Sequence, residues 1–249
     1  SLIFTVDATA PTVIIIAPTA ASPTYRKTPT TIYVSYNYTD SHAKNATIRI
    51  YNATHTIGQT TITALVAGAN VNRNDSVAVA AAADGAYDVS VTIYDVADHS
   101  ATSVEVNAVI IDNTPPVVNI TFPTEGAYLD SVAVIWVNGT VTELNKGTDQ
   151  PVINDTRFTL AYWDSASGVF AFSNNTAIPD GLVALRVSFT DLAGNTGSDT
   201  VSFTIDTIPP VVNITYPTNG AYLDSVSVIW INGTVTELNK VFPFLQPTI

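Results

Sequence analysis

The chain has 249 residues, of which 46% are hydrophobic and 12% charged, and its formal net charge is −12. The apolar share argues against a disordered chain. The acidic balance argues against nucleic acid as a partner, because nine Lys and Arg residues spread along the chain form no basic surface for phosphates. No apolar run approaches the ~20 residues of a membrane-spanning helix, so we expect no membrane span in this segment. Cysteine is absent, which excludes disulfides and thiolate metal sites.

Residues 1–6 (SLIFTV) match Thr200–Ile205 (TVSFTI) when both segments are aligned on the Asp that follows. In this alignment Leu2, Phe4 and Val6 fall on Val201, Phe203 and Ile205. We therefore predict that residues 1–6 are the last strand of a preceding module. By the same reasoning we expect the chain to be a segment of a longer array.

A first module is predicted over residues 7–111. Apolar side chains alternate with polar ones at Ile32, Val34, Tyr36 and Tyr38, which is the period of a half-buried strand. Further strands are expected over 46–51, 87–93 and 101–111. The Ala- and Val-rich stretch 66–83 is ambiguous, and a short helix at 77–83 is one alternative.

A second module is predicted over residues 112–205. The apolar run Val132–Val137 predicts a central strand, and we expect Trp136 to pack in its core. The alternative for Trp136 is an aromatic platform that binds sugar. Asp164–Gly168 reads as a hairpin turn. After Asp180-Gly181, a strand is expected with its apolar side chains inward, at Val183, Leu185, Val187 and Phe189.

A near-identical repeat dominates the chain. Pro115–Lys146 returns 94 positions later as Pro209–Lys240, and 28 of the 32 residues are the same. A fixed period with near-identity indicates a tandem array that grew by copying whole modules. Residues 206–249 are therefore predicted to be a partial third module that holds its first strands only.

Short, evenly spaced strands separated by turn residues predict an all-β sandwich for each module. A run of the form D-G-x-[YV] followed by D-x-A-[GD]-[NH] occurs at Asp84–His99 and at Asp180–Asn195. It is followed by the linker residues Asp112 and Asp206, and Val6–Pro11 matches it in part.

This motif resembles the Ig-like tandem-repeat domains of large bacterial and archaeal surface proteins, of the surface-layer, stalk or adhesin type. The resemblance implies an all-β fold, with tandem Ig-like β-sandwich modules in a linear array. Module 1 departs from the motif at Asp98-His99, where module 2 has Gly194-Asn195.

Ten sequons of the form N-x-[ST] stand in the chain, where chance predicts about four. Their excess favours an exported glycoprotein whose partners include N-linked glycans. The alternative is a Thr- and Asn-rich β-protein whose sequons are never modified. The acceptor residues are Asn37, Asn45, Asn52, Asn74, Asn119, Asn138, Asn154, Asn174, Asn213 and Asn232.

Carboxylates recur at the predicted module junctions. In an Ig-like sandwich the turn after the second-to-last strand lies beside the linker that leads into the module. This geometry places Asp95 and Asp98 near Asp7, and it places Asp191 near Asp112. The loops at Asp40 and Glu143 are expected at the same poles. Hard oxygen ligands of this kind suit Ca²⁺, whereas the alternative role is turn formation and capping. The resemblance supports calcium, since several families of surface Ig-like arrays stiffen their joints with it.

No catalytic constellation accompanies these features. His42, His55 and His99 are far apart in sequence, and we expect each to be a solvated loop or edge residue. The chain is therefore predicted not to be an enzyme. Our first interpretation is a structural component of the cell surface that associates with like chains in a lattice or filament. The alternatives are an adhesin stalk whose binding tip lies elsewhere, or accessory modules of a large secreted hydrolase.

Overall fold

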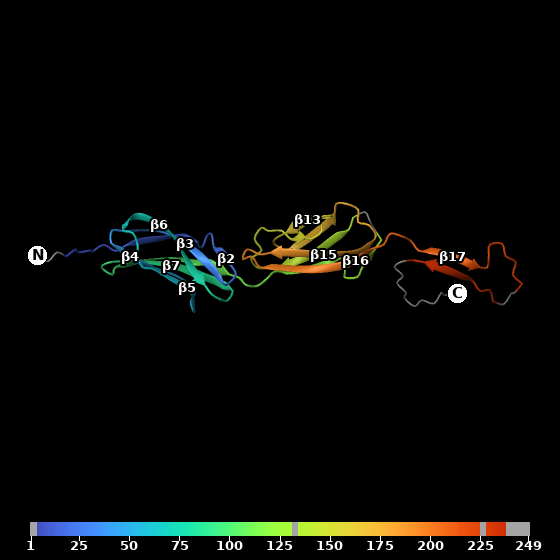
Figure 1. Cartoon of the computed structure of the whole chain (residues 1–249), viewed down its shortest axis with the longest axis horizontal. Helices are drawn as coiled ribbons and strands as arrows, with labels where there is room; N and C mark the ends of the chain where they lie inside the picture. Colours follow the sequence, from blue (N-terminus) through green and yellow to red (C-terminus); the bar gives the residue numbers. More distant parts are fainter. Residues whose placement is uncertain (1–3, 131–133, 225–227, 238–249) are drawn as a thin grey trace.

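The computed structural model describes residues 4–130, 134–224 and 228–237, and every regular element within them is a β-strand. Two β-sandwich modules and a two-stranded hairpin follow one another along the long axis of the molecule (Figure 1). Among the described residues, no helix has the length and apolar character needed to cross a membrane. Residues 1–3 and 238–249, which belong to the predicted strand 1–6 and to the predicted third module, lie outside the described part. Residues 4–6 of that predicted strand form no strand in the structure.

Module 1 is built from eight strands. They are β1 (Thr12–Ala17), β2 (Thr24–Arg26), β3 (Thr30–Asp40), β4 (Ala43–Tyr51), β5 (Thr56–Ile62), β6 (Gly68–Val79), β7 (Gly85–Asp95) and β8 (Ser100–Ile111). One sheet has the order β1-β3-β6 and the other β2-β8-β7-β4-β5. Strand β2 pairs in parallel with β8, while the other pairings are antiparallel.

The helix considered at 77–83 does not form. Strand β6 instead runs to Val79 and pairs antiparallel with β3 from Gly68 to Val79. Val77 and Val79 are buried, whereas Ala78 between them is exposed. Pairing with a long neighbouring strand therefore overrides the helix propensity of the alanines.

Module 2 also has eight strands, but they are divided four and four between its two sheets rather than three and five. They are β9 (Val117–Phe122), β10 (Tyr128–Leu129), β11 (Trp136–Thr142), β12 (Val152–Ile153), β13 (Phe158–Asp164), β14 (Val169–Asn174), β15 (Gly181–Thr190) and β16 (Thr196–Ile205). The sheet orders are β13-β14-β11-β9 and β10-β16-β15-β12. In immunoglobulin lettering these are D-E-B-A and A′-G-F-C, which is the arrangement of an immunoglobulin sandwich. The predicted all-β, Ig-like sandwich fold is confirmed.

Each module has a hydrophobic core of its own. The core of module 1 draws on both of its sheets and includes Ile32, Val34, Ile48 and Val91. The core of module 2 includes Phe170, Phe172 and Phe203, together with the predicted inward residues Val183, Leu185, Val187 and Phe189. Because the two clusters share no residue, the modules are separate packing units along one rod.

The prediction that Trp136 packs in the core is wrong. Strand β11 begins at Trp136, and its buried residues are Val137, Gly139 and Val141, so Trp136 lies on the outer face and is 43% exposed. Asn138 shares that outer face by the two-residue period of the strand. Trp163 does pack inward, against Phe189 at a ring-centroid distance of 5.6 Å.

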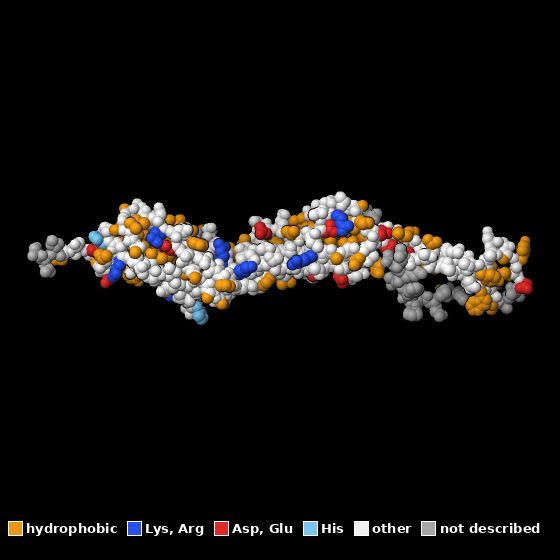
Figure 2. Space-filling view, viewed as in Figure 1, with side chains coloured by type: hydrophobic (Ala, Val, Ile, Leu, Met, Phe, Trp, Pro, Cys, Tyr) orange, Lys and Arg blue, Asp and Glu red, His pale blue; other side chains and the backbone are white. Residues whose placement is uncertain are grey.

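The last described segment is an antiparallel pair, β17 (Val211–Tyr216) and β18 (Asn232–Thr236). It repeats the pairing of β9 with β11, including the register irregularity next to the sequon asparagine. Lys and Arg side chains appear singly along the rod in the view of Figure 2 rather than as a patch.

Candidate metal centre at the joint between the modules

Three carboxylates meet where module 1 passes into module 2. Asp112 follows β8, Glu143 follows β11 and Asp191 follows β15, and their ligand atoms all lie within 4.8 Å of one another. Asp112 and Asp191 are only 5% and 4% exposed. The topology that suggested Asp191 beside Asp112, with Glu143 at the same pole, thus matches the positions seen in the structure.

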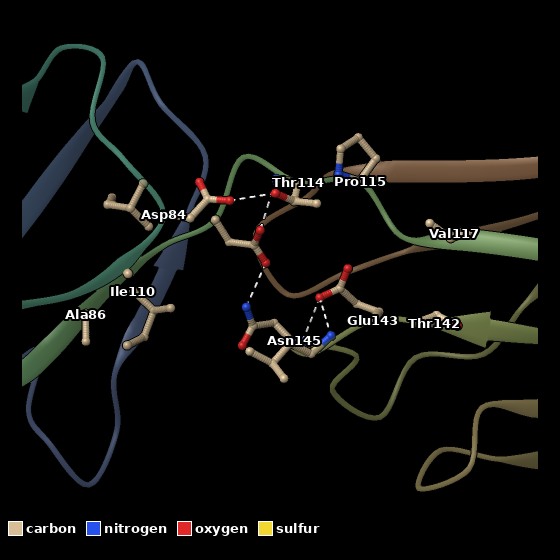
Figure 3. Close-up of a pocket in the computed structure, with 13 residues that line it drawn as sticks. Asp84, Ala86, Ile110, Thr114, Pro115, Val117, Thr142, Glu143 and Asn145 are labelled. Carbon is tan, nitrogen blue, oxygen red and sulfur yellow. Dashed lines mark hydrogen bonds between the residues drawn. The ribbon is translucent and has the colours of Figure 1, made fainter.

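Amide groups hold these carboxylates in place. The Asn195 backbone N–H donates to Oδ1 of Asp191 at 2.8 Å, and its Nδ2 donates to Oδ2 of Asp191 and to the Asp112 carbonyl, both at 2.9 Å. Nδ2 of Asn145 donates to Oδ2 of Asp112 at 2.7 Å. The Asn145 backbone N–H also donates to Oε1 of Glu143 at 2.8 Å (Figure 3). Two asparagines therefore fix all three acids.

A cavity of about 590 Å³ lies beside the cluster, between the two modules. Its lining comes from the end of module 1, with Asp84 and Ile110, and from the start of module 2, with Val117 and Glu143 (Figure 3). Across the joint, Nζ of Lys27 also donates to the Gly194 carbonyl at 2.7 Å. The joint is thus formed by contacts of both modules as well as by the linker.

The N-terminal pole of module 1 repeats this hydrogen-bond pattern with histidines. The His42 backbone N–H donates to Oδ1 of Asp40 at 2.6 Å, and His42 Nδ1 lies 3.1 Å from Oδ2 of Asp7. The Val96 N–H donates to the His42 carbonyl at 3.0 Å, just as the Leu192 N–H donates to that of Asn145. His42 therefore occupies the place of Asn145, in the turn that follows β3, and its side chain is still 42% exposed.

His99 in turn occupies the place of Asn195. Its backbone N–H donates to Oδ1 of Asp95 at 2.9 Å, and its Nδ1 lies 2.8 Å from Oδ2 of Asp95. Burial pushes the pKa of the Asp95 carboxyl up, but the hydrogen bonds from His99 and from the backbone outweigh it, so this pKa lies below its usual range. The contacts of His42 and His99 with the acids of this pole were not predicted from the sequence, because the two histidines are 57 positions apart.

The Asp98 carboxylate is exposed, whereas the carboxylates of Asp7 and Asp95 are buried. Asp98 pairs with Lys44 at 2.9 Å on the surface. Its backbone φ is +64°, close to the +85° of Gly194, the residue at the same place in module 2. The departure from the motif at Asp98 thus preserves the left-handed turn, in which Asp is among the better tolerated residues.

The predicted acceptor asparagines differ in what their side chains do. Oδ1 of Asn154 accepts from the Arg186 N–H at 2.7 Å. Asn174 uses both ends of its amide, since Oδ1 accepts from the Ile135 N–H at 2.6 Å and Nδ2 donates to the Thr176 carbonyl at 3.1 Å. Asn119 and Asn138 instead lie on neighbouring strands of the outer sheet face of module 2. Asn119 and Asn154 are exposed, whereas Asn138 and Asn174 are half-buried.

No protein-family model and no curated protein matches the chain. Among solved structures, the fibronectin(III)-like modules of CbhA from Clostridium thermocellum are 16% identical, with a TM-score of 0.36 over 78% of this chain and 94% of that chain. Murine CEACAM1b is 10% identical, with a TM-score of 0.36 over 79% and 100% of the two chains. A chimeric titin Z1Z2 is 11% identical, with a TM-score of 0.34 over 78% and 96%. At these values the Ig-like assignment depends on the strand order of the two modules.

Proposed function

We propose that this chain belongs to an exported, non-enzymatic glycoprotein of the cell surface, in which Ig-like modules repeat to build a surface layer, stalk or filament. The observation that carries the proposal is the end-to-end joining of two modules with separate cores, followed by a near-copy of the opening of module 2. In such arrays each module contacts mainly its neighbours, so length grows with copy number. A spacer or lattice element uses that property directly.

The spacer function predicts a length change when a module is added. A second copy of residues 112–205, inserted between Ile205 and Asp206, should lengthen the protein by the length of one module, because each copy brings its own linker and core. Small-angle X-ray scattering of both proteins measures the maximum dimension. A 94-residue Gly/Ser insert at the same site is the control, and it should behave as a flexible coil. An inserted module that folds but leaves the maximum dimension unchanged would contradict the proposal.

We further propose that the cluster of Asp112, Glu143 and Asp191 holds a Ca²⁺ ion that stiffens the joint. Ca²⁺ prefers oxygen ligands such as carboxylates and carbonyls. The three residues of the cluster offer carboxylate oxygens and no nitrogen or sulfur ligand. Within the described part of the chain, none of the three makes an ion pair. At ~4.8 Å and an effective dielectric constant of ~20, two carboxylates repel by roughly 3 kcal/mol, which a bound cation relieves.

Calcium is therefore expected to stabilise the joined modules, and EDTA to reverse the effect. For a dissociation constant of ~0.1–1 mM, typical of extracellular modules, ~5 mM Ca²⁺ adds about 1–2 kcal/mol to the free energy of unfolding. Glu143→Gln should reduce this gain, whereas Asp149→Asn, an exposed acid of the same module, should not. Calorimetry with Ca²⁺ and with EDTA measures both. Identical melting in the two conditions would refute the calcium site and leave the spacer proposal standing.

A further inference from the structure

Three large aromatic side chains are exposed on the solvent-facing side of one sheet of module 2. Phe122 is 41% exposed, Trp136 43% and Tyr162 53%, and they belong to β9, β11 and β13 of the sheet β13-β14-β11-β9. The exposed face of an antiparallel sheet usually carries polar side chains. A cluster of exposed aromatics on such a face therefore indicates a group that covers it.

The strand register places Asn138 in the middle of these aromatics. Asn138 pairs with Phe122 on one side and with Ala171 on the other, and Ala171 pairs with Tyr162. Trp136 precedes Asn138 by two positions on β11, so both point to the outer face. With ~4.8 Å between strands and ~6.6 Å between alternate residues, all three aromatic positions lie within roughly 10 Å of Asn138.

Asn138 is also the acceptor of the sequon Asn138-Gly139-Thr140. Its side-chain amide makes no hydrogen bond to any residue that the structure describes, whereas both ends of the Asn174 amide are engaged. A sugar attached at Asn138 therefore breaks no side-chain hydrogen bond to the described residues, although Asn138 itself is half-buried. The covalent attachment point lies within the exposed aromatic cluster.

We propose that the N-linked glycan of Asn138 folds back onto the sheet, with its first sugar rings lying on Trp136 and Phe122. A pyranose ring presents C–H groups on its face and hydroxyls at its rim, so it covers apolar surface while its hydroxyls remain in water. Tyr and Trp side chains combine an apolar body with a polar group in the same way. The inference rests on the proposed function, since it requires an exported glycoprotein.

The same arrangement recurs in the next copy of the repeat. There Asn232 pairs with Tyr216, and Trp230 precedes Asn232 by two positions. The substitution of Phe122 by Tyr216 between the copies keeps an aromatic ring opposite the sequon asparagine. Both described copies of this strand pair thus combine a glycan acceptor with the same two aromatic positions.

The test uses the protein secreted by a host that attaches N-linked glycans, with occupancy of Asn138 read from glycopeptide masses. Asn138→Gln is expected to lower the melting temperature of module 2 by about 4 °C, because the aromatic surface loses its cover. In a Trp136→Ala background the same substitution should produce little further change. Acrylamide quenching of tryptophan fluorescence should increase in Asn138→Gln, since Trp136 becomes accessible.

Asn119→Gln is the matched control, because it removes a sequon from the same sheet face at a position paired with Thr140 rather than with an aromatic residue. It should change neither the melting temperature nor the quenching. Finding Asn138 unoccupied would overturn this inference together with the glycoprotein part of the proposed function. An occupied Asn138 whose removal has the same effect with and without Trp136 would overturn the inference alone.

Discussion

Phe203→Ala is expected to lower the free energy of unfolding of module 2 by about 3–5 kcal/mol. Phe203 lies on β16, is completely buried and belongs to the core cluster that also contains Phe170 and Phe172. Removing its ring leaves a cavity that the two sheets cannot close without moving apart. Since small domains are stable by only ~5–15 kcal/mol, module 2 should melt far below its normal temperature.

The same variant tests whether the modules are independent. Module 1 has a core that shares no residue with that of module 2, so its transition in differential scanning calorimetry should stay in place while the other moves down. Phe4→Ala is the control, because Phe4 is 79% exposed and its loss should change neither transition by more than ~0.5 kcal/mol. A single transition that shifts as a whole would show that the two sandwiches unfold together, contrary to the spacer model.

The strand pattern and the meeting of acids at the joint could be predicted from the sequence, because each follows from a period or from topology. Alternation identified Val183, Leu185 and Val187 as inward residues, and all three are buried. The chain path of an Ig-like sandwich placed Asp191 beside Asp112 although they are 79 positions apart in the sequence. These inferences need no knowledge of side-chain packing.

The position of Trp136 could not be predicted, because the run 132–137 is apolar at every place and has no alternation. Which face is inward is decided by pairing, since Val137 lies opposite the buried Phe172 of β14. Only the part of this run from Val134 onward lies within the described residues. A uniform apolar stretch therefore predicts burial of the strand without telling which of its side chains are buried.

The roles of His42 and His99 were hidden for a different reason. Each histidine contacts an Asp at the N-terminal pole of module 1. Only the comparison in three dimensions with Asn145 and Asn195 shows that the equivalent pole of module 2 has the same hydrogen-bond pattern. A half-buried ion pair on β6, which also binds Tyr36 of β3, was missed for the same reason. Arg73 pairs with Asp75 at 2.7 Å, and the Tyr36 hydroxyl donates to Asp75 at 2.8 Å. Burial, followed by this contact with Asp75, raises the pKa of Tyr36.

Gly168→Ala is expected to cost about 2–5 kcal/mol, because two separate penalties coincide at this turn. Gly168 has a φ of +76°, where a Cβ atom costs ~1–2 kcal/mol. A Cβ built there would also lie 2.0 Å from the Val141 carbonyl oxygen of β11, and relieving such a clash costs a further ~1–3 kcal/mol. The contact is close because the Val141 N–H donates to the Gly168 carbonyl at 2.8 Å, which docks the β13–β14 turn on β11.

Gly126→Ala separates the two penalties. Gly126 lies in the same module with a nearly equal φ of +73°, but a Cβ there meets no atom within 4 Å. Its substitution should therefore cost only the ~1–2 kcal/mol of the left-handed conformation. Chemical denaturation of both variants measures the difference, which is the cost of the clash with β11. Equal losses for the two variants would mean that the β13–β14 turn can move away from Val141. The hydrogen bond between Val141 and Gly168 would then not hold this turn firmly on β11.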